Sequence, residues 1–403
     1  MKARWIIGVV VGFFGLLLGV AGQLHAQSGA IYACVNNSSG EVKIVAPGST
    51  CKNNWTLVTW DASRTEPAVF AVNCDDDQTI QGALRQRLIP GDKLLVSGTC
   101  NENVNVSSPA VANTLIGITL DGHGSATIHG DTTQPTVRIT ASGITIKGFT
   151  ITGGQHGIRV TGNNTTISGN TIDGAARDGI VLTMGGAATI DGNTVQYAGR
   201  FGINLDQSSA ARIVNNTAQN NTSHGILVDE SSSGRIGFLT FSDTVAAPNT
   251  IVSNGGSGIA VVRSSSAVIL GNTISNNTFR GIDVFRTSHA DIGANTINAN
   301  GQDGIFLREN SAVNLGDTGI AFDRANSTTS NNGVGPTGPF GPGVGLRCRD
   351  GGVARVRPGG NLGSLNGVSG AKDFGVTATS TENSAITINS QGCIDRAPLP
   401  PTP

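Results

Sequence analysis

Charged and aromatic side chains recur at fixed distances from a Gly-Ile dipeptide that repeats through the middle of this 403-residue chain. Each of them stands two residues before the isoleucine, one residue after it or three residues after it. Such columns contain the groups that enzymes use for proton transfer and for binding sugars: carboxylates, imidazoles, guanidinium groups and aromatic rings. The candidates are, in chain order, Asp178, Phe201, Asp206, His224, Asp229, Arg280, Phe306 and Arg308.

Two of the carboxylates, Asp206 and Asp229, occupy equivalent positions in consecutive repeats. If consecutive repeats stack as β-strands, these residues lie about 4.8 Å apart, which is near the carboxylate spacing of retaining glycosidases. A like-charged neighbour raises the pKa of one member of such a pair. We therefore predict Asp206, Asp229 and Asp178 as acid/base candidates and His224 as a proton carrier.

The basic and aromatic members of the columns indicate what a substrate would be. Arg280 and Arg308 are suited to clamp the carboxylates of an acidic sugar, and Phe201 and Phe306 are suited to offer flat surfaces to sugar rings. We predict no metal ligands in these columns. The alternative is that the whole set is a solvated polar face, which any exported repeat protein needs.

The element that must position these side chains is the repeat itself. Successive Gly-Ile dipeptides are 22, 23, 23, 33, 23 and 23 residues apart. A second apolar residue follows two positions after each isoleucine, which is the alternation of a strand with one buried face. An asparagine column keeps the same register and predicts a ladder of side-chain amides at one turn. Its members are Asn170, Asn193, Asn216, Asn272 and Asn295.

A unit of this length with short strands and Gly/Asn turns cannot bury its own apolar side, whereas stacked units can. The sequence therefore predicts an all-β right-handed parallel β-helix, a solenoid of 22–23-residue coils with inward isoleucines. The longer interval indicates one coil with about ten extra residues after Ile236. Leucine-rich repeats lack support because their Leu-x-x-Leu-x-Leu frame is missing, and a propeller blade needs about twice the period.

The Gly-Ile-x-Val pattern with Ile-x-Gly-Asn-Thr-Ile resembles the right-handed parallel β-helix repeats of the pectin-lyase-like superfamily. The resemblance covers roughly residues 72–366. It implies the fold and a ligand lying along an outer face, and polysaccharide is the ligand class that it favours. This chain lacks the motifs of the well-known enzymes of the superfamily. The calcium-binding carboxylates of the lyases are not matched position for position, and the paired Asp motifs of polygalacturonases and the Asp-Pro motif of alginate epimerases are absent. The resemblance therefore names no particular activity.

Two features precede the repeats. Residues Gln78 to Leu88 resemble the amphipathic helix that caps the first coil of such proteins. Asp75, Asp76 and Asp77 lie just before it, and we predict that they cap this helix rather than bind calcium. Residues 27–65 are predicted to form a small β module that needs a disulfide because it is too small to build a core.

Six cysteines in an exported chain indicate disulfides. The pairs Cys34–Cys51, Cys74–Cys100 and Cys348–Cys393 each bracket a separate segment, and we predict these three, although other pairings stay open. A zinc site is the alternative, but the chain has no Cys-x-x-Cys and no cluster of histidines nearby.

The chain ends indicate export. Residues 1–26 have a basic start, an uncharged run and an Ala-ending processing site, which predicts a cleaved signal peptide; an uncleaved membrane anchor is the alternative. Residues 316–345 are predicted to form a long loop, residues 367–396 a disulfide-tethered segment and residues 397–403 a disordered Pro-rich tail. We expect a secreted, periplasmic or cell-surface protein whose mature form is not embedded in a membrane.

A formal net charge of −1 and 13% charged residues exclude a strongly basic nucleic-acid binder. We therefore predict an exported protein that binds or modifies extracellular polysaccharide and needs no cofactor. Whether it is an enzyme stays open. The alternative function is that of a non-catalytic structural or adhesive surface protein built on the solenoid.

Overall fold

The computed structural model describes residues 30–38, 41–46, 48–61, 66–86, 88–107, 117–240, 242–315, 328–332, 345–356 and 365–367. The predicted signal peptide, most of the long loop, nearly all of 367–396 and the Pro-rich tail lie outside these residues. The chain divides into two compact units between Glu66 and Pro67, and each is considered by itself.

The N-terminal unit contains one antiparallel sheet with the strand order β2-β1-β3. Its strands are β1 (Ala30–Asn36), β2 (Val42–Val45) and β3 (Trp55–Asp61). A disulfide joins Cys34 in β1 to Cys51, as the sequence predicts. So small a sheet has little apolar area to bury, so the disulfide supplies the cross-link that a larger core would otherwise replace.

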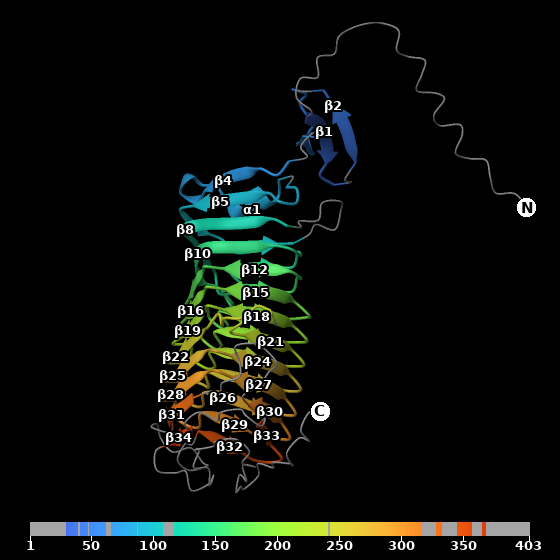
Figure 1. The fold of residues 1–403 in the computed structure, drawn as a ribbon. Coiled ribbons are helices and arrows are strands. Elements are labelled where there is room, and N and C mark those ends of the chain that lie inside the picture. The colour runs from blue at the N-terminus through green and yellow to red at the C-terminus, as the bar shows by residue number, and fades with distance from the viewer. Residues whose placement is uncertain are drawn as a thin grey trace, which may run out of the picture. The chain divides into compact units, whose positions relative to one another are not determined.

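The second unit is a right-handed parallel β-helix (Figure 1). One of its walls is a ten-stranded parallel sheet in which every coil contributes a three- or four-residue strand. Its strands are β7 (Val104–Val106), β9 (Val137–Ile139), β11 (Ile158–Val160), β14 (Ile180–Leu182), β17 (Ile203–Leu205), β20 (Ile226–Val228), β23 (Ile259–Val262), β26 (Ile282–Phe285), β29 (Ile305–Leu307) and β32 (Leu346–Cys348).

The remaining strands form the other walls. The first coils use β4 (Val69–Asn73), β5 (Lys93–Ser97), β6 (Thr99–Asn101) and the long strands β8 (Thr119–Gly130) and β10 (Thr145–Gly153). A second wall continues with β12 (Thr165–Ser168), β15 (Ala187–Asp191), β18 (Ala210–Val214), β21 (Ser233–Ile236), β24 (Ser266–Leu270), β27 (His289–Gly293), β30 (Ala312–Leu315) and β33 (Val353–Val356). The third wall continues with β13 (Thr171–Asp173), β16 (Thr194–Gln196), β19 (Thr217–Gln219), β22 (Thr250–Val252), β25 (Thr273–Ser275), β28 (Thr296–Asn298), β31 (Thr328–Asn332) and β34 (Leu365–Gly367).

The predicted isoleucine stack is confirmed. Ile226 pairs in register with Ile203 on one side and with Ile259 on the other. All seven isoleucines of the Gly-Ile repeats are at most 2% exposed: Ile158, Ile180, Ile203, Ile226, Ile259, Ile282 and Ile305. Stacking thus buries the apolar side that a single coil leaves open.

The long interval is also confirmed as one coil with an insertion. Strand β21 ends at Ile236, and β22 begins at Thr250. Within the inserted segment Phe238 is fully buried against Leu270 on the outside of the solenoid. The insertion therefore has a small apolar cluster of its own.

Side-chain ladders close the turns. In the predicted ladder each asparagine accepts the backbone N–H and side-chain amide of the asparagine one coil earlier, and Asn249 fills the place between Asn216 and Asn272. The structure adds a second ladder of Asn221, Asn254, Asn277 and Asn300. A serine ladder of Ser209, Ser232, Ser265, Ser288 and Ser311 closes the turn after the ten-stranded sheet. Buried turns therefore have hydrogen-bond partners from coil to coil.

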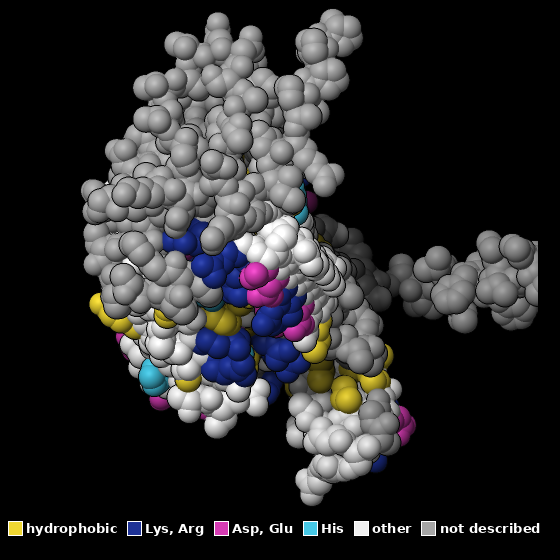
Figure 2. Space-filling view, turned by 90° about the horizontal axis from the view of Figure 1, so that it is seen from below, with side chains coloured by type: hydrophobic (Ala, Val, Ile, Leu, Met, Phe, Trp, Pro, Cys, Tyr) yellow, Lys and Arg dark blue, Asp and Glu magenta, His cyan; other side chains and the backbone are white. Residues whose placement is uncertain are grey.

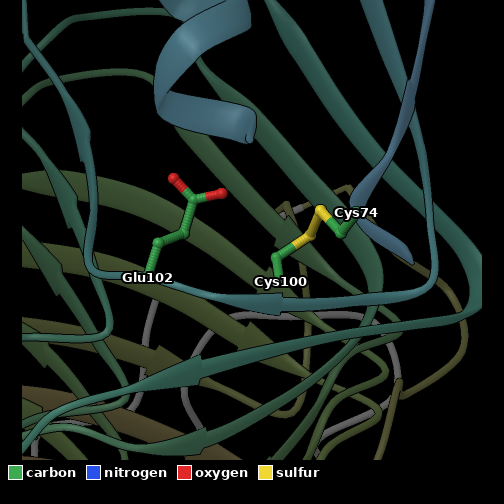
Figure 3. A group of neighbouring side chains, drawn as sticks. All are labelled: Cys74, Cys100 and Glu102. Atoms are coloured by element: carbon green, nitrogen blue, oxygen red, sulfur yellow. A yellow bond between two sulfur atoms is a disulfide. The ribbon is translucent and has the colours of Figure 1, made fainter. Parts of the chain in front are cut away.

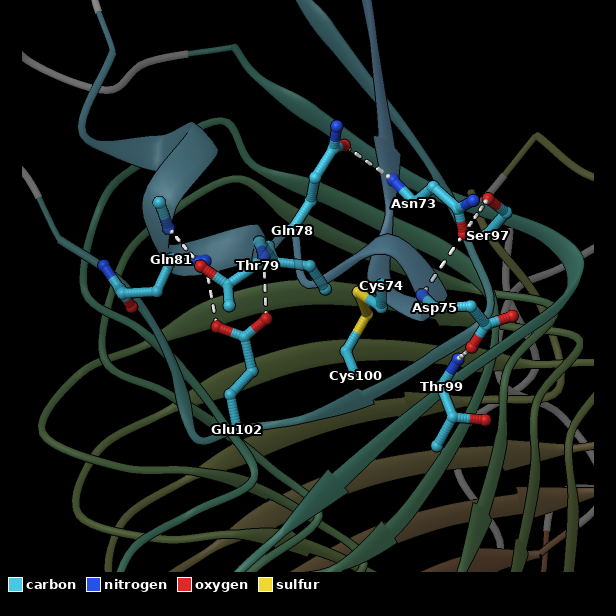
Figure 4. Close-up of a disulfide and its surroundings, with 12 residues drawn as sticks. Asn73, Cys74, Asp75, Gln78, Thr79, Gln81, Ser97, Thr99, Cys100 and Glu102 are labelled. Carbon is cyan, nitrogen blue, oxygen red and sulfur yellow. Dashed lines mark hydrogen bonds between the residues drawn. A yellow bond between two sulfur atoms is a disulfide. The ribbon is translucent and has the colours of Figure 1, made fainter.

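The capping helix is shorter than predicted, and its cap is different. Helix α1 spans Ile80–Leu84, and its N-cap is Thr79, whose hydroxyl accepts the Gly82 N–H at 2.9 Å. The carboxylate of Glu102 accepts the N–H groups of Ile80 and Gln81 at 2.6 and 2.9 Å (Figure 4). The prediction that the aspartate run caps α1 is wrong, because a carboxylate from the next coil is better aimed at the helix end.

The aspartate run instead belongs to a separate short helix. Asp75 and Asp76 lie in the 3-10 helix η1 (Cys74–Asp76), and Asp77 ends it in the left-handed conformation. Asp75 also accepts the Thr99 N–H at 3.0 Å, which ties this segment to the following coil. Beside it the predicted disulfide joins Cys74 to Cys100.

Candidate functional site

The candidate residues lie on the outward side of the ten-stranded sheet over strands β14 to β29, which we call the ten-strand face. The middle residue of each short strand points outward because its neighbours point into the core. These outward residues are nevertheless at most 5% exposed, because side chains from the adjoining columns pack over them. They are Val181, Asn204, Leu227, Ala260, Asp283 and Phe306.

An apolar patch occupies the centre of this face. Leu227, Ala260 and Val262 form a buried cluster outside the solenoid core, and Phe201 and Phe285 pack against it. Both phenylalanines keep part of their surface exposed. An apolar floor with partly exposed rings is a surface that can receive the flat face of a sugar or another small ring.

Asp178 lies at one end of this patch and is completely buried. Arg200 donates to both of its carboxylate oxygens at 2.7 and 2.6 Å, and His156 Nδ1 lies 3.3 Å away. Burial by itself raises the pKa of Asp178, but the adjacent His156 ring and the hydrogen bonds from Arg200 outweigh it and lower the pKa to about 2. Asp178 is therefore an ionised anchor for Arg200 rather than a proton carrier.

Asp206 and Asp229 lie on consecutive coils, as the register predicts, because Leu205 pairs with Val228 immediately before them. Their surroundings differ. Asp229 is buried and forms an ion pair with Arg263. Asp206 is half-buried, and its carboxylate makes no hydrogen bond within the described residues. Asp206 thus keeps oxygen atoms accessible, whereas Asp229 positions an arginine.

His224 joins the patch by stacking on Phe201, with ring centroids 5.5 Å apart and planes 9° apart. Burial and the charge of Arg280 lower its pKa to about 4, so the ring is neutral near pH 7. The Ser257 N–H donates to Nδ1 at 3.0 Å, so the neutral ring carries its proton on Nε2. His224 is therefore placed as a hydrogen-bond donor.

At the other end of the patch Arg280 is buried. Its Nη1 lies 3.0 Å from an oxygen of Asp283, and its Nε lies 3.9 Å from Asp303. Its guanidinium covers the Phe306 ring at 4.1 Å. Phe306 has no exposed surface, so we do not retain it as a platform for a sugar.

Arg308 is partly exposed and lies over the Phe285 ring at 3.8 Å. Its Nη2 is 3.7 Å from Asp283, the same carboxylate that Arg280 contacts. Burial raises the pKa of Asp283 despite these two arginines. Its Oδ1 is buried without a hydrogen-bond partner, and such an atom in a native protein requires an explanation.

Sequence reasoning did not select several members of these clusters. Asp283, Asp303 and Arg347 lie with Arg280 and Arg308 at the second end of the apolar patch, where Arg347 Nε lies 2.9 Å from Asp303. The signal was present, because Asp303 stands in the same column as Arg280 one coil later and opposite charges in one column attract.

One group of possible metal ligands, Cys74, Cys100 and Glu102, comes close together in the described part of the chain (Figure 3). The two cysteines are joined in a disulfide and the glutamate caps α1, so these atoms do not suit a metal ion. Cys348 is also disulfide-bonded, but Cys393 lies outside the described residues, so the third pairing stays a prediction.

Basic side chains gather on one part of the surface together with acidic and apolar ones (Figure 2). On the ten-strand face the exposed or partly exposed cations include Arg177, Arg200, Arg263, Arg286 and Arg308. Among the described residues no helix is long and apolar enough to cross a membrane.

Comparison with solved structures finds distant likenesses. A pectate lyase, Pel9A, is 15% identical, with 84% of this chain and 89% of that chain covered and a TM-score of 0.47. The A-module of the Azotobacter vinelandii mannuronan C-5 epimerase AlgE4 is 15% identical, with 68% and 91% covered and a TM-score of 0.41. The Dettilon tailspike protein is 17% identical, with 69% and 62% covered and a TM-score of 0.46. No curated protein matches the sequence significantly.

The family model described as a right-handed beta helix region matches residues 96–246 and 242–391, which is most of the chain. This match agrees with the parallel strand register and the buried isoleucine stack described above. The chain belongs to the right-handed β-helix family.

Proposed function

We propose that this protein binds an extracellular polysaccharide that carries carboxylate groups, and that it does so along the ten-strand face. The observation that carries the proposal is the apolar patch of Phe201, Leu227 and Phe285, where the guanidinium groups of Arg200 and Arg308 lie over the two phenylalanine rings. Sugar rings present apolar faces, and uronic acids add carboxylates at their edges, so one surface with both features complements them.

The carboxylates of the face support binding by holding arginines in place. Asp178 fixes Arg200, Asp229 fixes Arg263, and Asp283 lies between Arg280 and Arg308. An arginine held in one orientation loses less side-chain entropy when it contacts a ligand. The ion pairs therefore preorganise the cations for a carboxylate-bearing chain.

Turnover is a second candidate function, and one observation favours it. Asp206 is the half-buried carboxylate of the predicted pair, and the charge of Arg200 acts on it. Asp206 is the residue to which we assign proton transfer if the bound sugar is modified, and the neutral ring of His224 is the hydrogen-bond donor that we assign to the opposite end of the strand column. The disulfides fit a protein that works outside the cytoplasm.

The test uses the purified chain with polygalacturonate, alginate and neutral dextran. Binding is followed by affinity electrophoresis, and new reducing or unsaturated ends report turnover. We expect both acidic polymers or one of them to bind and dextran not to bind. Phe285→Ala should weaken binding about tenfold, which corresponds to about 1.4 kcal/mol.

The matched control is Tyr197→Asn. Tyr197 is an exposed aromatic residue after β16, outside the ten-strand face, and its left-handed backbone suits asparagine. This variant should bind like the parent. If Phe285→Ala also binds like the parent, the ten-strand face is not the binding surface, and a structural role for the solenoid becomes the better interpretation.

A further inference from the structure

A second surface has the shape of a binding site. A groove of about 600 Å³ runs along the outside of β12, β15, β18, β21, β24 and β27, and we call it the lateral groove. None of its lining residues belongs to the ten-strand face. The five spacings of about 4.8 Å between its six strands give it a length of roughly 24 Å, which suits an extended chain rather than a compact ligand.

Short side chains make the hollow. Ala187, Ala210, Ser233 and Ser266 pair in register from strand to strand along the groove. A larger side chain in this column would fill the space. The next outward column, two residues along each strand, contains Thr189, Arg212 and Arg235, so longer polar side chains border the floor.

The inserted segment of the long coil builds part of the wall. Arg235 Nη1 donates to the Leu239 carbonyl at 3.3 Å, and Val268 packs against the cluster of Phe238 and Leu270. Arg235 and Val268 both line the groove. Extra residues in one unit of a repeat protein commonly lie at the binding face, and here the insertion borders the groove.

The groove has a cationic middle. Arg212 and Arg235 pair in register on neighbouring strands, so their charges lie side by side. Arg212 is exposed and makes no hydrogen bond or ion pair with any described residue. Two adjacent like charges repel each other, and an anion placed between them removes that repulsion.

Hydrogen-bonding groups occupy one end. His289 Nε2 lies 3.0 Å from Asp291 Oδ1, and Asn314 Nδ2 donates to the same oxygen at 2.7 Å. The hydroxyls of Thr189, Ser233 and Ser266 continue along the groove. No phenylalanine, tyrosine or tryptophan is among the described lining residues, so charge and hydrogen bonds must supply most of the affinity.

We propose that the lateral groove is a second binding site, which takes one strand of an anionic polysaccharide with carboxylate or sulfate groups over Arg212 and Arg235. A neutral polysaccharide lacks the charge that the arginine pair calls for and has no phenylalanine, tyrosine or tryptophan ring to stack on. An extended peptide fits less well, because the groove lies over the face of the sheet, where the backbone groups are already paired. The site is independent of binding at the ten-strand face.

The experiment counts sites on the full-length chain by calorimetric titration with short oligosaccharides of polygalacturonate, alginate and heparin. The parent should bind a second oligosaccharide that Ala210→Trp does not bind, because the indole fills the groove. Arg212→Ala should weaken this second site about tenfold through loss of one charge-assisted contact. Added salt should weaken the same site.

The matched controls are Ala176→Trp and Arg138→Ala. Ala176 and Arg138 are exposed, and neither lines the groove; Ala176 precedes β14, and Arg138 is the outward residue of β9, before the strands β14 to β29 of the ten-strand face. Phe285→Ala separates the two proposals. If the parent binds one oligosaccharide, and Ala210→Trp abolishes this binding whereas Phe285→Ala does not, the groove is a binding site and the ten-strand face is not. If Ala210→Trp and Arg212→Ala titrate like the parent, or if the parent binds none of the three probes, the groove proposal is overturned.

Discussion

The asparagine ladders and the ten-strand face are both arrays of buried polar side chains that repeat from coil to coil. In the ladder, Asn216 donates to the carbonyls of Ile190 and Val214 and to the amide oxygen of Asn249, and its own oxygen accepts from Asn193. On the ten-strand face, Asp283 Oδ1 and the Nε atoms of Arg280 and Arg308 are buried without hydrogen-bond partners. One array is satisfied by the fold alone, and the other is not.

This difference separates stability from function. A ladder rung repeats because every coil needs the same hydrogen bonds at the same turn. The face changes its residues from coil to coil, so its columns contain acids, bases and aromatics at different heights. A buried polar atom without a partner costs free energy, and proteins tolerate such costs at sites used for binding or catalysis. We therefore expect substitutions in the ladder to lower stability, and substitutions of the exposed arginines at the rim of the ten-strand face, such as Arg286, to weaken binding.

The largest effect is expected from Asn216→Ala. The substitution removes the acceptor for two Asn193 donors and the side-chain donor to the carbonyls of Ile190 and Val214, of which Val214 still accepts the Gly192 N–H. We expect the free energy of unfolding to fall by about 3–5 kcal/mol, because several buried groups lose a partner at once. Denaturant-induced unfolding measures it.

Asn215→Gly is the control for this variant. Asn215 is exposed, and its left-handed backbone is one that glycine adopts without strain. Its loss should cost less than about 1 kcal/mol. Equal stabilities of Asn216→Ala and the parent would mean that the ladder does not stabilise the turns.

An intermediate effect is expected from pH, through His224. Its pKa is lowered from 6.5 in the unfolded chain to about 4 in the folded protein. Between these values the unfolded state binds a proton that the folded state does not, so the free energy of unfolding falls as the pH falls from 6.5 to 4. We expect His224 to contribute about 1–3 kcal/mol to this loss.

The measurement compares the pH dependence of unfolding for the parent and His224→Gln, which does not titrate. The variant should be less stable than the parent at pH 7 but should lose less stability on acidification. Parallel curves between pH 7 and pH 4 would show that the ring is already solvated in the folded protein. Asp178 also begins to lose its contribution near pH 4, because its pKa of about 2 in the folded protein lies below the value of 3.8 in the unfolded chain, but it is present in both proteins and cancels in the comparison.

The fold was accessible from the sequence because it repeats. The inward isoleucines and the first asparagine column recur at one spacing, and the structure places them in one stack and one ladder. The second asparagine ladder was missed although its signal is present, because Asn221, Asn254, Asn277 and Asn300 each stand five residues after a member of the first ladder. The cap of α1 was missed because Glu102 reaches it from the next coil.

The candidate site was only partly accessible. The register placed Asp206 and Asp229 on consecutive coils, but it carried no information on which carboxylate pairs with which arginine. Phe306 and Phe285 both belong to the outward columns and both have an arginine over the ring, yet the first is fully buried and the second is partly exposed. These outcomes depend on which neighbouring coil a long side chain such as arginine contacts. The position of a residue in a sequence column does not give that information.

The smallest effect on stability, and the sharpest test of the face, is expected from Arg286→Gln. The Arg286 side chain is about half exposed, and its Nε lies 3.4 Å from Glu309. An exposed ion pair contributes little, so the free energy of unfolding should change by less than about 0.5 kcal/mol. If the rim binds carboxylates, the same substitution should weaken polyuronate binding about threefold, and the loss should shrink as salt is added.

Glu309→Gln is the matched control for the direction of the charge effect. It removes a negative charge beside the same arginine, so binding should be unchanged or tighter. Weaker binding in both variants would show that the Arg286–Glu309 pair shapes the rim, whereas opposite changes identify charge attraction as the reason why this face carries arginines that the fold does not need.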